Sequence, residues 1–135
     1  MEFRPLTDRY TVSPQITPAD VAAIKAAGFV RVICNRPDGE IPPDLHAALM
    51  RQAVEAAGLE FVENQIVPGN FSPDIVALQA QAMQADGPVF AYCASGNRCS
   101  HVWALAQAGQ VPADMLIATA ARWGYNLEPI RHRLG

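Results

Sequence analysis

Short apolar segments that alternate with helix-starting signals constrain the fold of this chain more than any other feature. Residues 30–34 and Val89–Tyr92 are apolar runs rich in β-branched and aromatic residues, with only Arg31 charged, and such runs are typical of buried strands. Thr17-Pro18 and Ser72-Pro73 indicate helix starts, because Thr or Ser caps the first turn and Pro fits the first helical position. Strands that alternate with helices through short connections predict a single α/β domain, with a mostly parallel central sheet flanked by helices.

The same signals divide the whole chain, residues 1–135, into the elements of one domain. Strands are expected over residues 10–13, 30–34, 59–64 and 89–92, and helices over 17–27, 43–57, 72–85, 98–108, 112–123 and, as a short last one, 126–134. In open parallel sheets, ligands bind beyond the carboxyl ends of the strands. Three loops, at residues 35–40, 67–71 and 93–97, follow such strand ends, so we expect them to converge on one site.

The composition narrows the class of protein. The 135 residues, 50% of them hydrophobic, are enough for one core, and a net charge of −3 argues against a nucleic-acid-binding surface. Three cysteines are an odd and low number, which is typical of reduced thiols in a cytoplasmic protein. Residues 1–5 show no signal-peptide pattern, and no apolar run approaches the length of a membrane span, so no membrane is expected.

A cysteine loop after the strand Val89–Tyr92 is the strongest functional signal. The loop leads into a helix, whose N-terminal N–H groups and dipole favour an anion. Cys93 at the mouth of such a loop should have a lowered pKa and exist largely as thiolate. Arg98 adds a planar, permanently charged group with two parallel donors. We therefore expect Cys93 and Arg98 to be catalytic, and a small anionic substrate to be bound. The residues expected to form the anion-binding loop are Ala94, Ser95, Gly96, Asn97, Cys99 and Ser100.

Four motifs in the chain resemble those of a known bacterial family. They are Gln15-Ile16-Thr17, Ile33-Cys34-Asn35-Arg36-Pro37-Asp38-Gly39-Glu40, Val67-Pro68-Gly69, and Ala91-Tyr92-Cys93-x-Ser95-Gly96-x-Arg98. The chain resembles the phosphatase-like domain that is found fused to beta-lactamase-like hydrolases and also alone. The resemblance implies the fold of cysteine-dependent dual-specificity phosphatases, with either phosphatase or rhodanese-like sulfurtransferase chemistry. Two residues depart from the family pattern: Ala94, where a basic residue is expected, and Pro14, where Gly is usual.

Two departures from the phosphatase pattern favour sulfur transfer. Phosphatases of this fold have five residues between Cys and Arg, whereas this chain has four, and the resulting six-residue loop is similar to that of rhodaneses, which carry a persulfide. Their general-acid Asp is also missing, because residues 68–71 contain no acid and Asp74 lies in a helical first turn. Losing a general acid costs about 10²–10⁴-fold in rate, whereas thiosulfate chemistry needs none.

The first expectation is therefore a sulfurtransferase that carries a persulfide from thiosulfate or another persulfide on Cys93. The alternative is a dual-specificity-type phosphatase that hydrolyses phosphoric esters with Asp38 from the neighbouring loop. A third possibility is a non-catalytic module that binds an anion or persulfide for a sulfur-oxidising partner enzyme. No cofactor is expected, and no His and Cys have metal-ligand spacing, so no metal is expected either.

Three residues of the loop at 35–40 or its edge are possible auxiliaries. Some related phosphatases protect the nucleophile with a second Cys in such a loop, so the resemblance suggests Cys34 as a resolving thiol for Cys93, against the alternative of a core residue. Arg36 either faces the anion or pairs with Glu40, and Asp38 is either an acid or a turn residue.

Two further side chains near the cysteine loop have expected structural roles. Cys99 is expected to pack beneath the loop, as small buried thiols do. His101 is expected to be a helix-surface residue rather than a general base.

Overall fold

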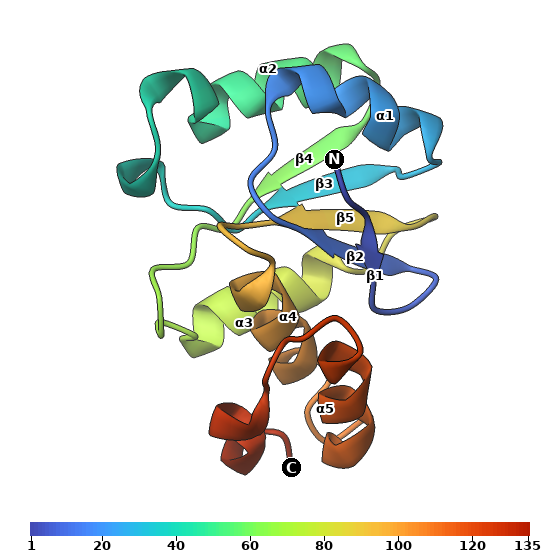
Figure 1. Cartoon of the computed structure of the whole chain (residues 1–135), viewed down its shortest axis with the longest axis vertical. Helices are drawn as coiled ribbons and strands as arrows, with labels where there is room; N and C mark the ends of the chain where they lie inside the picture. The colour runs from blue at the N-terminus through green and yellow to red at the C-terminus, as the bar shows by residue number, and fades with distance from the viewer.

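A five-stranded sheet forms the centre of the protein in the computed structural model, which describes all residues 1–135 (Figure 1). The strands are β1 (Arg4–Pro5), β2 (Tyr10–Ser13), β3 (Arg31–Cys34), β4 (Glu60–Glu63) and β5 (Val89–Tyr92). Their order across the sheet is β1-β2-β5-β3-β4; only β1 is antiparallel to its neighbour. β5 therefore lies in the middle, with its carboxyl end beside those of β2 and β3.

Helices cover both faces of the sheet (Figure 1). One face carries α1 (Val21–Ala26) and α2 (Ala47–Ala56), and the other carries α3 (Pro73–Ala82) and α4 (Asn97–Leu105). α5 (Ala113–Ala121) and the 3₁₀ helix η4 (Glu128–Arg133) form a further layer beyond α4. Three short 3₁₀ helices complete the fold: η1 (Pro18–Asp20), η2 (Asp38–Glu40) and η3 (Pro43–Leu45).

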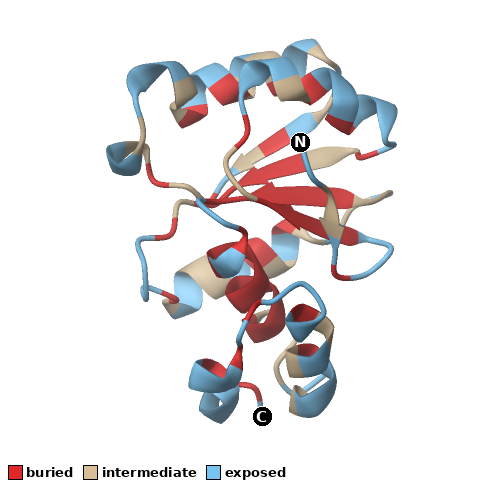
Figure 2. Ribbon diagram, viewed as in Figure 1, coloured by how far each residue is buried: buried red, intermediate tan, exposed pale blue.

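α4 is the most enclosed helix of the protein. Every residue of α4 after Asn97 is buried, and Figure 2 shows the helix almost wholly in the buried colour. A helix that is buried on all sides needs neighbours on all sides, and here these include the sheet, α3 and α5. The start of α4 is consequently held in place by packing around the whole helix.

The predicted α/β class and mostly parallel sheet are confirmed, with differences at the ends of elements. β1 was not predicted, because a two-residue edge strand that contains Pro5 carries no alternating pattern. The helix expected over 43–57 is divided, because His46 has an extended backbone (ψ 154°) between η3 and α2. The last segment forms the 3₁₀ helix η4. No helix has the length and hydrophobicity that crossing a membrane requires.

Candidate active site

Three loops meet at the carboxyl ends of the parallel strands, at the left-hand end of the sheet in Figure 1. Backbone hydrogen bonds join them: the Asn35 N–H donates to Tyr92 O at 2.9 Å, and the Ile66 N–H donates to Asn35 O at 3.0 Å. The cysteine loop begins directly after Tyr92 and enters α4. The predicted convergence of these loops is confirmed.

Cys93 lies at the base of this loop with a perturbed thiol. The Gly96 N–H donates to its Sγ at 3.1 Å. The Cys99 side chain, followed by the backbone N–H groups of Cys99, Ser95 and Gly96, lowers the pKa of Cys93 to about 6 despite burial. Cys93 is therefore mostly thiolate at neutral pH. Its exposed fraction is 0%.

Cys99 lies beneath the loop, as expected, with an exposed fraction of 0%. Burial raises the pKa of the Cys99 thiol well above its ordinary value, so this thiol stays protonated and donates to the Cys93 thiolate. The Cys99 carbonyl is fixed in turn, because the Tyr10 hydroxyl donates to it at 2.9 Å. One ionised and one protonated thiol therefore share the base of the loop.

Gly96 gives the loop its turn. It has φ +93°, a conformation that favours glycine, and a β-carbon there would overlap the hydroxyl oxygen of Tyr125. That hydroxyl donates to Ser95 O at 2.8 Å, and Arg4 Nη1 donates to the same carbonyl at 3.2 Å. Ser100 Oγ donates to Gly96 O at 2.8 Å. These outward-facing carbonyls are thus held by donors, while the N–H groups of Ser95 and Gly96 face the sulfur.

Arg98 is buried and ion-paired. Its Nη1 and Nη2 donate to Glu40 Oε2 and Oε1 at 2.9 and 2.8 Å, and Nη1 also donates to Ile66 O at 2.6 Å. A guanidinium has five N–H groups. The remaining pair, Nε–H and the second Nη2–H, has no partner in the protein. This side of Arg98 can bind two oxygens of an anion.

The auxiliary residues Arg36 and Asp38 have structural partners. Arg36 Nε donates to Glu40 Oε1 at 2.8 Å, so Arg36 pairs with Glu40 rather than facing the loop. Asp38 Oδ1 accepts a hydrogen bond from the Ala47 N–H at 2.8 Å, at the first residue of α2. We therefore interpret Asp38 as a cap for α2, which leaves the alternative phosphatase mechanism without the acid that the sequence suggested.

Of the two alternatives for Cys34, a resolving thiol or a core residue, the structure supports the core residue. The two strands are neighbours, but Cys34 is in register with Tyr92 and not with Cys93. A shift of one residue turns a side chain to the opposite face of a sheet. Cys34 consequently packs with Tyr92 in the core beneath α1 and α2, whereas Cys93 packs in the core of the other face. Burial raises the pKa of Cys34 to about 11, so it stays protonated.

A pocket of about 570 Å³ opens beside the cysteine loop. Ser95, Asn97 and Arg98 form one side, and the remaining lining comes from the loop after β4, from α4 and from η4. None of the lining residues is Asp or Glu. Eight lining residues lie outside the cysteine loop: Pro68, Gly69, Phe71, His101, Pro129, Ile130, His132 and Arg133.

His101 belongs to this pocket, and the expectation of a helix-surface residue is wrong. Its exposed fraction is 8%, and its ring stacks on Phe71 with centroids 5.7 Å apart. Burial lowers the pKa of His101, so the ring is neutral at neutral pH. Nδ1 lies 2.8 Å from Asn97 O and must donate to that carbonyl, which leaves Nε2 as an acceptor. The i, i+3 spacing from Arg98 was the one sequence signal for a shared helix face.

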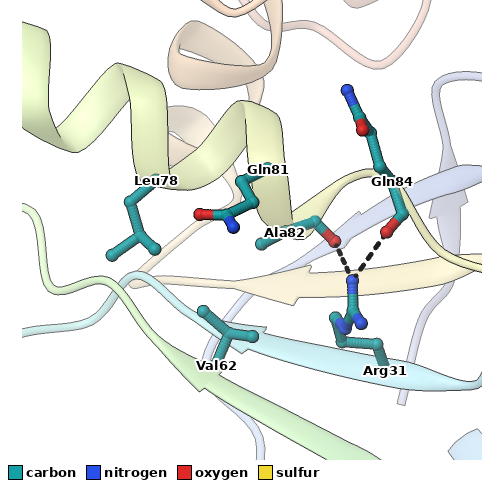
Figure 3. A pocket seen from close by; sticks show the side chains of 6 residues that line it. All are labelled: Arg31, Val62, Leu78, Gln81, Ala82 and Gln84. Atoms are coloured by element: carbon teal, nitrogen blue, oxygen red, sulfur yellow. Dashed lines mark hydrogen bonds between the residues drawn. The ribbon is translucent and has the colours of Figure 1, made fainter.

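A second pocket, of about 420 Å³, lies over the sheet beside α3 (Figure 3). Arg31, at the start of β3, is the only charged residue in its lining. Arg31 Nη1 donates to the carbonyls of Ala82 and Gln84 at 2.8 and 3.0 Å. Its lining holds no nucleophile or acid. We interpret this pocket as structural. The structure also gathers no group of three or more His, Cys, Asp or Glu side chains that could hold a metal ion.

A buried amide network fixes the loops relative to one another. Gln79 of α3 is fully buried, and its Oε1 accepts from Asn35 Nδ2 and Asn64 Nδ2, both at 2.9 Å. Its Nε2 donates to the Tyr10 hydroxyl at 3.0 Å, and that hydroxyl reaches Cys99 O. The network therefore connects the ends of β3 and β4 with the base of the cysteine loop.

These observations define a class of protein: a small α/β domain in which a cysteine loop enters a buried helix at the carboxyl end of a parallel sheet. The chain belongs to the family described as the phosphatase-like domain of beta-lactamase hydrolase-like proteins, whose model matches residues 2–110. The resemblance inferred from the motifs is thereby confirmed.

Individual relatives give the same assignment. A beta-lactamase hydrolase-like protein from Agrobacterium fabrum is 34% identical over 104 residues, which are 76% of this chain and 24% of that protein. The chain thus spans about a quarter of that relative's length. The crystal structure of a candidate phosphatase from Neisseria meningitidis is 36% identical, with a TM-score of 0.84 over 99% of this chain and 96% of that one.

More distant structures share the fold. The core catalytic domain of a PP-IP phosphatase from S. cerevisiae, solved in complex with citrate, has a TM-score of 0.68 at 11% identity. The alignment covers 98% of this chain and 82% of that one. The fold is thus that of the cysteine-dependent phosphatases, as the resemblance implied.

Proposed function

We propose that this domain is a cysteine-dependent phosphatase that hydrolyses phosphate monoesters through Cys93. The observation that carries the proposal is that a thiolate and an anion-binding guanidinium lie at the two ends of the same loop. The Cys93 thiolate, which predominates at neutral pH because its pKa is about 6, is the nucleophile. The Nε–H and second Nη2–H of Arg98 have no partner and supply two parallel donors. Membership of the phosphatase-like family and the 36% identity to the Neisseria structure support this chemistry.

The reaction has two steps. The Cys93 thiolate attacks phosphorus, the P–O bond to the leaving group breaks, and a phosphocysteine forms. Arg98 and the inward N–H groups of the loop bind the nonbridging oxygens, whose charge must be stabilised in the transition state. Water then attacks phosphorus, the S–P bond breaks, and phosphate leaves with the thiolate restored.

The site lacks a carboxylic acid that could protonate the leaving group. No carboxylate lines the pocket, so the leaving oxygen receives no proton from an Asp. His101 also lines the pocket, but burial lowers its pKa, so its neutral ring does not supply that proton at neutral pH. We expect aryl phosphates with good leaving groups to react much faster than alkyl phosphates.

The missing carboxylate also favours a second candidate function, sulfur transfer. In this reaction the Cys93 thiolate attacks the outer sulfur of thiosulfate, the S–S bond breaks, and sulfite leaves with the electron pair. The Cys93 persulfide then gives its outer sulfur to an acceptor such as cyanide, which restores the thiolate. No acid is needed at either step.

Assays of one preparation test both candidates. Release of p-nitrophenol from p-nitrophenyl phosphate should be measured beside thiosulfate:cyanide sulfurtransfer, for the wild type and for Cys93→Ser and Cys34→Ser. We expect phosphate ester hydrolysis that Cys93→Ser abolishes and Cys34→Ser retains. Sulfurtransfer alone, with an added sulfur on Cys93 by mass spectrometry, would replace the proposal with the second candidate. Inactivity in both assays would leave an anion-binding module.

A further inference from the structure

We infer that the pocket beside the cysteine loop binds a second acidic group, so that the substrates are phosphate monoesters whose leaving group carries an anion. This inference rests on the proposed phosphatase function. The pocket is continuous with the cysteine loop, because Ser95, Asn97 and Arg98 line it, and it extends to Arg133 of η4. A substrate with its phosphoryl group at the loop therefore projects its leaving group toward η4.

Arg133 is the cation that would meet the second anion. Its Nη2 donates to Phe71 O at 2.9 Å, and this bond fixes the guanidinium to the loop after β4. Arg133 forms no ion pair, so its other donors remain available. His132 lines the same pocket. Arg98 of the lining is neutralised by Glu40, so the unpaired charge of the pocket is that of Arg133. In a protein of net charge −3, a pocket with this unpaired cation and no acid in its lining favours anions.

Arg131, on the same helix η4, differs from Arg133 because it is ion-paired. Arg131 lies outside the pocket, and its guanidinium pairs with Asp114 at 2.7 Å and Glu128 at 2.9 Å. The two arginines are two residues apart on one short helix, yet the chain neutralises only Arg131. Arg133 consequently remains the unneutralised charge, and it faces the site.

The space between the loop and Arg133 suits a flat organic group. Phe71 and His101 line it as a stacked pair with an angle of 8° between their rings. Both side chains are at least nine-tenths buried, so their orientation is fixed. A phosphoryl group at Arg98, an aromatic ring beside this pair and a carboxylate or phosphate at Arg133 would occupy the pocket together.

Two matched substrates test the inference. The first substrate is para-ethylphenyl phosphate, whose leaving group carries no charged substituent. The second is para-(carboxyethyl)phenyl phosphate, in which the same ethyl chain ends in a carboxylate. We expect the wild-type KM to be roughly tenfold lower for the carboxylate ester, which corresponds to about 1.4 kcal/mol for one charged contact at an exposed arginine. Arg133→Gln should remove this preference, so that the two esters then have equal KM values. Arg131→Gln is the control and should retain the preference.

Two results would overturn the inference: equal KM values for the two esters in the wild type, or a preference that persists in Arg133→Gln. Hydrolysis of neither ester would instead contradict the proposed function. In that case calorimetric dissociation constants of the same two esters decide the matter. The inference then requires tighter binding of the carboxylate ester, which Arg133→Gln abolishes and Arg131→Gln retains.

Discussion

At the scale of single residues, the protonated Cys99 thiol makes the largest favourable contribution to the ionisation of Cys93. Cys99→Ala removes this donor and should raise the Cys93 pKa above about 6. The thiolate fraction increases as the pH rises through the pKa, so activity should be lost mainly on the acid side and recover at alkaline pH. The pH profile of kcat/KM and thiolate ultraviolet absorbance measure the shift.

Cys34→Ala serves as the control for this prediction. Cys34 lies in the other core and contacts neither Cys93 nor the loop amides, so the inflection should stay near 6. Cys99→Ser restores a hydroxyl donor and should recover part of the shift. An unchanged profile in Cys99→Ala would show that the backbone amides alone stabilise the thiolate.

Gly96 is the second residue whose role can be isolated. Gly96→Ala should cost roughly 1–2 kcal/mol from its left-handed backbone alone, and more because the new methyl overlaps the Tyr125 hydroxyl. Gly109→Ala is the control, since Gly109 has φ +82° and no atom within 4 Å of a β-carbon. Urea unfolding should show the larger loss for Gly96→Ala. Equal losses would mean that Tyr125 moves aside freely.

At the scale of elements, the amide network centred on Gln79 joins α3 to the loops after β3 and β4. Gln79→Leu leaves the buried Asn35 and Asn64 amides without their shared acceptor. We expect a loss of about 2–6 kcal/mol in the free energy of unfolding, because two buried donors lose their acceptor and each costs about 1–3 kcal/mol. Gln81→Leu, an exposed position on the same helix, should change stability by no more than about 0.5 kcal/mol.

The parallel strands could be predicted from the sequence, whereas their register and the ion pair of Arg98 could not. β2 and β5 were predicted with their observed bounds, because short β-branched and aromatic runs between turn residues carry a strong local signal. The position of Cys34 relative to Cys93 depends on strand register, which local sequence does not encode. Glu40 of η2 pairs with both Arg36 and Arg98. Its pairing with Arg36 was one of the alternatives predicted from the sequence. The pairing with Arg98 was not predicted, because it depends on the position of η2 relative to α4.

At the scale of the whole molecule, residues from both ends of the chain hold the cysteine loop. Arg4 comes from β1, and Tyr125 follows α5, beyond the residues 2–110 that the family model matches. Arg4 Nη1 donates to the Tyr125 hydroxyl at 2.8 Å, and both groups donate to Ser95 O. Arg4 Nε is also paired with Glu2 Oε1 at 2.8 Å, so Arg4 acts on the loop through its hydrogen bonds rather than as a free charge.

Tyr125→Phe tests whether this contact orients the loop. Losing the hydroxyl removes one donor from the Ser95 carbonyl, a loss of about 0.5–1.5 kcal/mol, so we expect kcat/KM to fall roughly two- to tenfold. The Cys93 pKa should rise, because the Ser95 and Gly96 amides are then less firmly aimed at the sulfur. Trp123→Phe is the matched control.

Trp123 Nε1 donates to Pro5 O at 2.8 Å and thus joins the same two chain segments without touching the loop. Trp123→Phe should therefore lower stability while leaving the Cys93 pKa and kcat/KM of the folded protein unchanged. If both variants lower the melting temperature and neither moves the Cys93 pKa, the two chain ends merely stabilise the fold. A pKa shift confined to Tyr125→Phe would show that the distant ends of the chain set the reactivity of the loop.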